Sequence, residues 1–153
     1  MLTQVLNRSG FFYCAETILQ KIKEEKSNAF IIFLDIDGLK SVNDNLGHEI
    51  GDAFIAKIAG ILKEVVPKDC LIMRYGGDEF VVFGSCKQAG RMQRIAEDIK
   101  AAIKTADQKE NRSYHLAASL GCSLHKSYEM DNLNSLIELA DKKMYEEKKN
   151  KRR

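Results

Sequence analysis

The chain has 153 residues, 44% of them hydrophobic and 30% charged, which is typical of one globular domain with its own core. A net charge of +2 is too small to indicate nucleic acid as a main partner, and no run of 18 apolar residues predicts a membrane span. Four scattered cysteines without a Cys-x-x-Cys pair, and an N-terminus without a secretion signal, favour reduced, mostly buried thiols in a cytoplasmic protein.

Hydrophobic periodicity divides the first half of the chain into helices around one strand. The predicted elements are a helix from residue 7, a strand over residues 29–34, a short helix over residues 39–46 and a longer helix from residue 49. The strand is a continuous apolar run, AFIIFL, which is typical of burial on both faces. Pro67 closes the longer helix.

The second half of the chain predicts a hairpin, a helix, a strand and a final helix. The elements are strands over residues 70–74 and 79–83, a helix over residues 92–103, a strand over residues 115–124 and a helix over residues 133–144. Gly76 and Gly77 lie in the short connection between the first two of these strands.

The order of the central elements predicts the fold. Without the first and last helices it is strand, helices, strand, strand, helix, strand, which is the ferredoxin-like split β-α-β arrangement. We therefore expect an α+β fold with a mainly antiparallel sheet flanked by helices. Its third strand lies between the first two and runs antiparallel to the first. This topology brings Asp35 beside Asp78 and Glu79, although they are more than 40 residues apart.

Carboxylates gathered at one edge of a sheet repel one another unless a cation offsets their charge. Oxygen ligands of this kind suit Mg²⁺ or Mn²⁺, and Mg²⁺ completes its shell with water and phosphate. Gly76 and Gly77 would permit positive φ and leave room for a bulky ligand near the backbone. The alternative is a solvated hairpin tip with surface acids, because turns favour the same residue types.

The segment after the first predicted strand is the candidate phosphate site. Asp35-Ile36-Asp37-Gly38 does not continue as a calcium loop, since Leu46 stands where the closing glutamate is needed. Neither a Walker phosphate loop nor a GxGxxG motif is present. A phosphate would instead use the amides that open the next helix, where Lys40 has the right charge.

Five segments resemble the GGDEF family of diguanylate cyclases in order and spacing. They are LTQVLNR (2–8), FLDIDGLKSVNDNLGHEIGD (33–52), RYGGDEF (74–80), SLG (119–121) and ADKKMYEEKKNKRR (140–153). The sequence departs from the family pattern at Gln4 and Leu6, and again at Glu147 and Lys151, where the family usually has alanine and glycine.

The resemblance implies a fold like the palm of nucleotide cyclases and polymerases. It also implies condensation of two GTP molecules into cyclic di-GMP with release of two pyrophosphates. Two copies of the domain would face each other, each holding one GTP. The alternative is a catalytically silent GTP-binding module that regulates an attached domain, such as a phosphodiesterase. The intact Asp35, Asp78 and Glu79 favour the enzyme.

Matching residues give the expected roles around the metal. Asp35 and Asp78 resemble the family's metal carboxylates, and Ile36 would add its backbone carbonyl. Two Mg²⁺ or Mn²⁺ ions per GTP would neutralise the triphosphate and activate the 3′-hydroxyl. Glu79 would be a metal ligand or a proton-handling residue.

Asn43 and Asp52 match the guanine-reading residues of the family. An aspartate that accepts from N1–H and N2–H₂ distinguishes GTP from ATP, and Asp52 favours cyclic di-GMP over a mixed dinucleotide. Without the family, Asn43 would be a surface or capping residue and Asp52 a favourable acid in a helix's first turn.

The expected phosphate contacts are Lys40, Lys148 and Arg152, while Gly76 and Gly77 would leave room for the nucleotide. Without the family, the basic C-terminal segment would be a solvated helix end or a weak nucleic-acid patch.

Many family members carry an inhibitory Arg-x-x-Asp product site five residues before the signature. The corresponding window here is Pro67-Lys68-Asp69-Cys70, which lacks both key residues, so we expect no product inhibition through it. A cyclic di-GMP receptor is disfavoured for the same reason, and a polymerase palm by the short chain.

We expect residues 1–153 to form a single domain of a longer protein with an upstream sensory or dimerising module. Such a domain would be weakly active alone, since catalysis needs two GTP-loaded sites to meet. Any membrane anchor would lie in the upstream segments.

Overall fold

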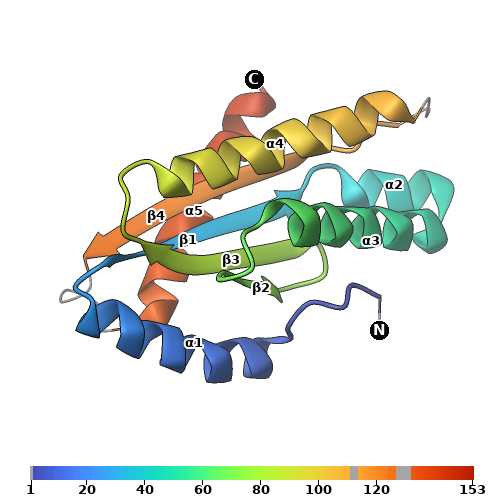
Figure 1. Ribbon diagram of the computed structural model, residues 1–153. Coiled ribbons are helices and arrows are strands. Elements are labelled where there is room, and N and C mark those ends of the chain that lie inside the picture. Colours follow the sequence, from blue (N-terminus) through green and yellow to red (C-terminus); the bar gives the residue numbers. More distant parts are fainter. Residues whose placement is uncertain (1, 111–113, 127–131) are drawn as a thin grey trace.

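The structure is a computed structural model that describes residues 2–110, 114–126 and 132–153. Within these ranges the elements are α1 (Arg8–Glu24), β1 (Asn28–Ile36), α2 (Leu39–Leu46), α3 (His48–Val65), β2 (Leu71–Arg74), β3 (Glu79–Cys86), α4 (Arg91–Lys109), β4 (Ala118–Lys126) and α5 (Leu133–Lys151). Figure 1 shows α3 and α4 on one side of the sheet and α5 on the other.

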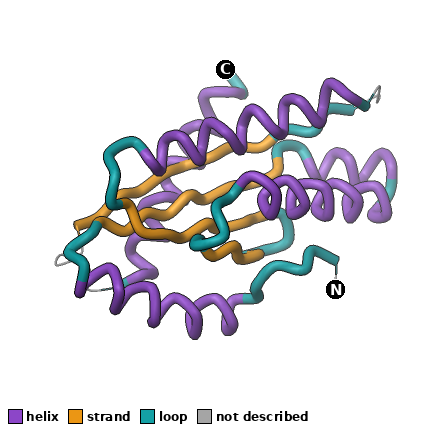
Figure 2. The backbone as a smooth tube through the Cα atoms, viewed as in Figure 1, coloured by secondary structure: helices purple, strands orange, loops and turns teal. Residues whose placement is uncertain are grey.

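The four strands form one sheet in the order β2-β3-β1-β4, and all neighbouring strands pair antiparallel. This order confirms the ferredoxin-like arrangement, with β3 between β1 and β2 (Figure 2). The outer edge of β2 is joined by the N-terminal segment through the Leu6–Met73 bridge. On the other side, β4 pairs only with β1 within the described residues.

Alternation along β1 divides the core between the two faces of the sheet. Phe30, Ile32 and Leu34 pack with α3 and α4. Ile31 and Phe33 pack with α1 and α5. Successive strand residues point to opposite faces, so a run that is apolar throughout supplies both cores. The predicted burial of this strand is therefore confirmed.

The predicted fourth strand begins later than expected. The sequence predicts a strand over residues 115–124, whereas the ladder starts at Ala118 and runs to Lys126. The Leu116 amide instead donates to the Asp107 carboxylate of α4 at 2.7 Å. The ladder starts at Ala118 because β1 ends at its partner Ile36, after which the chain turns into α2.

All four cysteines are free thiols; Cys70 and Cys86 are buried, while Cys14 and Cys122 are only partly so. Burial raises the pKa of the Cys70 thiol to about 11. Among the helices that the structure describes, none is long and apolar enough to cross a membrane.

Candidate active site

Two acidic segments meet at one end of the sheet. Asp35, near the end of β1, is paired in register with Glu79, the first residue of β3. The Ile36 amide donates to the carbonyl of Asp78 at 3.0 Å, which joins the end of β1 to the hairpin. The predicted convergence of these acids is confirmed, because β3 lies directly beside β1.

The glycine-containing hairpin is held in shape by the side chain of Arg74. Its Nε donates to the carbonyls of Gly76 and Gly77 at 3.2 Å each, and its Nη2 donates to Gly77 at 2.7 Å. Across the turn, the amides of Tyr75 and Gly76 donate to the Glu79 carbonyl at 2.8 and 3.3 Å. The turn that presents Asp78 is thus fixed by five hydrogen bonds within its own segment.

The expectation of positive φ at Gly76 and Gly77 is wrong. Among the described glycines, left-handed φ occurs only at Gly38, Gly47 and Gly90. A Cβ on Gly76 would come within 2.4 Å of the Glu79 Oε2 atom, whereas a Cβ on Gly77 would meet nothing within 4 Å. The first glycine therefore makes room for a carboxylate, and the second leaves open space beside the backbone.

Asp35 is only 8% exposed, and Lys148 of α5 forms an ion pair with its Oδ1 atom. Burial raises the pKa of Asp35 above its usual value, and the charges of Asp78 and Asp37 act in the same direction. Lys148 opposes these effects without cancelling them. The carboxylate is therefore poorly compensated even with its lysine partner.

Glu79 has the same kind of environment. Burial is the largest cause of its raised pKa, followed by the negative charges of Asp35, Asp78 and Asp141. Two neighbouring carboxyls with raised pKa values mark a place where a bound cation would be stabilising.

The donor set suits a hard divalent cation that the protein ligates only in part. In residues 2–110, 114–126 and 132–153, no three acidic, histidine or cysteine side chains are grouped so as to hold a metal alone. Mg²⁺ commonly uses one or two protein carboxylates and takes its remaining ligands from water and phosphate. Asp35, Asp78 and Glu79 are the side chains that would hold it. The role of the Ile36 carbonyl stays a prediction.

The N-terminus of α2 follows directly from the acidic end of β1. Gly38 is its N-cap, with a left-handed φ of 71°, and no side chain caps the first turn. Its first-turn amides are therefore left for solvent or a ligand, and Lys40 is exposed in the same turn. This geometry suits the predicted phosphate contact.

Asn43 carries an unsatisfied acceptor at the junction of α2 and α3. Its Oδ1 atom is buried and has no hydrogen-bond donor among the described residues. It packs so closely on Gly51 that a Cβ there would come within 1.8 Å of the oxygen. Asp52 follows Gly51 in the sequence and is exposed on α3. The two predicted guanine readers therefore lie at one junction, and a buried acceptor needs a donor.

The basic residues of α5 are placed differently from one another. Lys148 contacts Asp35, as described above, whereas Arg152 is the exposed C-cap of α5. Lys148 reaches the sheet because α5 packs directly on β4 at Gly121, where a Cβ would lie 2.0 Å from the Ala140 carbonyl oxygen. The structure thus brings Lys148 into the acidic cluster, whereas the part played by the exposed Arg152 stays a prediction.

The whole chain, residues 1–153, matches the family described as diguanylate cyclase, GGDEF domain. The chain belongs to the GGDEF domain family. The resemblance seen in the sequence is therefore confirmed, and with it the family's α+β fold.

Relatives and solved structures agree with this assignment. The GGDEF domain is 31% identical to diguanylate cyclase A of Treponema denticola over 130 residues, covering 84% of this chain and 35% of that protein. It is 36% identical to the Vibrio cholerae diguanylate cyclase VdcA over 120 residues, covering 77% and 35%. The GGDEF domain of Caulobacter crescentus DgcB, solved in complex with c-di-GMP, superposes with a TM-score of 0.85 at 26% identity, covering 98% of this chain and 89% of that one.

The chain spans about a third of the length of the curated relatives just named. Those relatives therefore contain further sequence beside the part that resembles this GGDEF domain.

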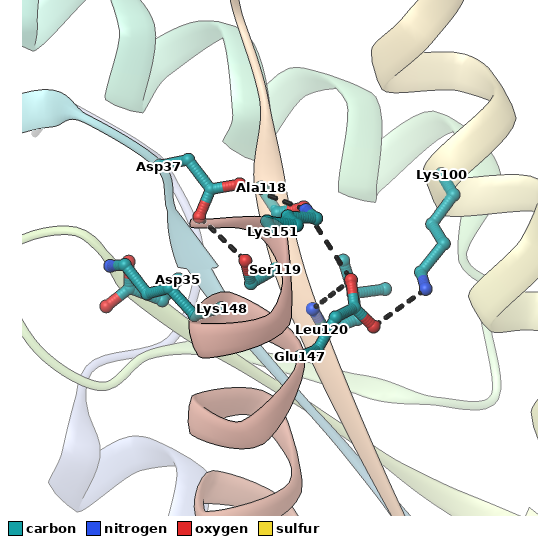
Figure 3. A network of polar contacts seen from close by, with 9 residues as sticks. All are labelled: Asp35, Asp37, Lys100, Ala118, Ser119, Leu120, Glu147, Lys148 and Lys151. Carbon is teal, nitrogen blue, oxygen red and sulfur yellow. Dashed lines mark hydrogen bonds and ion pairs between the residues drawn. The ribbon is translucent and has the colours of Figure 1, made fainter. Parts of the chain in front are cut away.

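Sequence reasoning did not assign several side chains that the structure places around the site. Arg74 was visible in the signature, but only the fold shows that it holds the hairpin carbonyls. Asp37 was given no role of its own. Asp37 accepts from the Ser119 hydroxyl at 2.7 Å and from Lys151 Nζ at 3.0 Å (Figure 3).

The window of the family's product site is occupied by an internal ion pair. Asp69 accepts from Arg91 Nη2 at 2.6 and 2.9 Å, and this bond lowers the pKa of the Asp69 carboxyl. Arg91 also donates to the Ser85 carbonyl at 2.7 Å. The nearby acid is thus already engaged, and the absence of product inhibition stays a prediction.

Proposed function

We propose that this GGDEF domain is a diguanylate cyclase that condenses two GTP molecules into cyclic di-GMP, with release of two pyrophosphates, across a pair of facing domains. The observation that carries the proposal is that Asp35 lies beside Asp78 and Glu79 in one cluster, whose negative charge Lys148 only partly offsets. The names of the curated relatives support the same activity.

In each half-reaction the 3′-oxygen of one GTP bonds to the α-phosphorus of the other. The bond from that phosphorus to the bridging oxygen of the β-phosphate breaks, pyrophosphate leaves, and the hydroxyl proton passes to water. Bound Mg²⁺ or Mn²⁺, two per GTP, would supply neutralisation of the triphosphate and activation of the hydroxyl. The side chains proposed to hold these ions are Asp35, Asp78 and Glu79, together with the Ile36 carbonyl.

The remaining roles follow from what each residue offers. Lys148 would turn from Asp35 to the triphosphate, joined by Lys40 at the start of α2 and by Arg152. The unsatisfied Asn43 Oδ1 atom and the Asp52 carboxylate would accept from the guanine edge. Adenine lacks the paired N1–H and N2–H₂ donors, so these acceptors favour GTP. The open space at Gly77 leaves room for the nucleotide.

The test is product formation by the domain fused to a strong dimeriser, with GTP and Mg²⁺. Because Asp78 would hold the ions, we expect Asp78→Ala to lower the yield of cyclic di-GMP by at least about 100-fold. The matched control is Asp98→Ala, which removes an exposed aspartate of α4 and should leave the yield unchanged.

If the parent fusion binds GTP but forms no product, the enzyme proposal fails and a silent GTP-binding module replaces it. Equal yields from the parent and Asp78→Ala would overturn the role given to the acidic cluster.

A further inference from the structure

Two side chains, Glu147 and Lys151, connect the last turns of α5 to α4, to β4 and to the segment after β1 (Figure 3). We call these two residues the α5 clasp. Lys151 Nζ donates to the Ala118 carbonyl at 2.6 Å and lies 3.0 Å from the Asp37 Oδ2 atom. It also lies 3.5 Å from Glu147 Oε1, one turn back on the same helix. A single ammonium group thus joins the helix to β4 and to the segment that follows β1.

Glu147 completes the clasp from the preceding turn. Its Oε2 atom accepts from Lys100 of α4 at 2.8 Å, and its Oε1 atom accepts from the Leu120 amide at 3.4 Å. Figure 3 shows these contacts converging from α4, α5 and β4. The Glu147 side chain is 26% exposed, so water only partly screens its ion pairs.

The clasp uses the free edge of the sheet as its anchor. β4 is the last strand in the order and pairs only with β1 within the described residues, so its other edge lacks a strand. Along an edge strand, alternate backbone groups point away from the sheet. Lys151 and Glu147 bind two of these groups, the Ala118 carbonyl and the Leu120 amide. The anchor is therefore backbone held in place by the β1–β4 ladder.

Clasp residues alternate with the residues proposed to contact phosphate. Glu147 immediately precedes Lys148, and Lys151 immediately precedes Arg152. The last turn of a helix has unsatisfied carbonyls and tends to fray, which would release any side chain that it carries. The clasp positions are also the two places where this closing segment departs from the usual alanine and glycine of the family pattern.

We propose that Glu147 and Lys151 are positioning residues for the triphosphate: they hold the last turns of α5 against the β4 edge, so that Lys148 and Arg152 stay at the nucleotide site. This inference rests on the proposed function, because it takes the triphosphate as the ligand of Lys148 and Arg152. The clasp itself touches no reacting atom and acts only through the helix end.

The test compares Lys151→Met with Lys149→Met in the dimerised fusion. Both changes remove one positive charge and keep a long side chain of similar helix propensity, but Lys149 is exposed and lies over the ring of Tyr145 on its own helix. Three quantities are measured: affinity for a non-hydrolysable GTP analogue with Mg²⁺, KM and kcat for product formation, and amide hydrogen exchange over residues 145–153.

We expect Lys151→Met to weaken analogue binding and raise KM by about three- to tenfold, as for the loss of a partly exposed ion pair, with kcat nearly unchanged. Exchange over residues 145–153 should become faster. Lys151→Arg should restore both, because a guanidinium can still donate to Asp37 and Ala118. Lys149→Met should match the parent in affinity and exchange.

A second pair of variants tests the other half of the clasp. Glu147→Ala restores the family's usual residue and should act in the same direction as Lys151→Met, whereas Glu146→Ala, at an exposed neighbouring position, should not. These readouts separate positioning from general stability, since a merely structural role would lower the melting temperature without raising KM.

Unchanged exchange and affinity in Lys151→Met would overturn the inference, as would equal losses in Lys149→Met, which would show a general charge effect. If the parent itself fails to bind the analogue, both the proposed function and the positioning role fall. A parent that binds, with a Lys151→Met variant that binds equally well, leaves the proposed function standing and removes only the clasp.

Discussion

Asp35 and Glu79 are paired on the adjacent strands β1 and β3, and water only partly solvates their carboxylates. Asp35 has Lys148 as a partner, whereas Glu79 forms no ion pair within the described residues. Repulsion by Asp35, Asp78 and Asp141 acts on Glu79 more strongly than the attraction of Lys148. Without a bound cation, the ionised form of Glu79 therefore destabilises the folded state. The carboxylates that suit the proposed chemistry therefore lower the free energy of unfolding of the metal-free protein.

We predict that Glu79→Gln stabilises the metal-free domain at pH 7 by up to about 1 kcal/mol, a gain limited by solvent screening of this half-buried group. A raised pKa means that the folded state holds the proton more tightly than the unfolded chain. The stability from Glu79 is thus complete below its ordinary pKa of 4.5 and is lost as the pH rises through the raised value. Urea unfolding at pH 7 and pH 4.5 should show the gain only at the higher pH.

Glu146→Gln is the control for this prediction, since it neutralises an exposed acid on α5. A gain of equal size in both variants would mean that net charge, and not the crowding of acids around Glu79, sets the stability. Glu79→Gln should also lose product formation in the dimerised fusion, which the control should keep.

At the scale of elements, the site depends on how closely α5 packs on β4. Gly121 allows the contact: a Cβ there would lie 2.0 Å from the Ala140 carbonyl oxygen and 2.2 Å from the Met144 amide nitrogen. Both are backbone atoms of a helix, so they cannot turn aside as a side-chain tip would. The same packing carries Lys148, one turn beyond Met144, to Asp35.

We predict that Gly121→Ala destabilises the domain by about 3 kcal/mol, because the helix must move away from the sheet. The comparison is Gly60→Ala in α3, where a Cβ would meet nothing within 4 Å. That change should stabilise the domain by about 0.5–1 kcal/mol, since alanine favours a helix interior. Urea unfolding of both variants checks the pair, and a Gly121→Ala variant as stable as the parent would refute the close approach.

At the scale of the whole molecule, one sheet separates two cores and carries the site at one end. α3 and α4 cover one face, while α1 and α5 cover the other (Figure 1). The residues proposed to act come from both layers: Asn43 and Asp52 from α2 and α3, and Lys148 from α5. In the proposed reaction this assembly is half of an active site, because a second GTP must arrive on a second copy.

We predict that the rate of cyclic di-GMP formation per chain rises with protein concentration when the domain carries no dimeriser. In dilute solution the encounter of two GTP-loaded copies limits the reaction, so doubling the concentration should about double the rate per chain. The dimerised fusion should show a constant rate per chain over the same range. A rate per chain that is independent of concentration in the unfused domain would contradict the requirement for two copies.

Much of the element order could be read from local patterns. The short helix over residues 39–46 was predicted with the bounds that the structure has, because its neighbours Gly38 and Gly47 mark both ends. The fourth strand starts later than predicted because its partner β1 ends at Ile36, and no local pattern in residues 115–117 shows where that partner ends. The error about φ at Gly76 has a similar origin, since the nearby Glu79 carboxylate, and not a positive φ, leaves no room for a Cβ there.

The sequence by itself determined the family, the strand order and the meeting of Asp35 with the hairpin. These depend on periodicity, on a small set of allowed topologies and on residues that stand next to one another in the chain. Only the tertiary structure decided which charged side chains pair. Lys148 and Asp35 are 113 residues apart, and Asp37 and Ser119 are 82 apart. Such pairing depends on how closely α5 packs on the sheet, and short-range patterns carry no information about that distance.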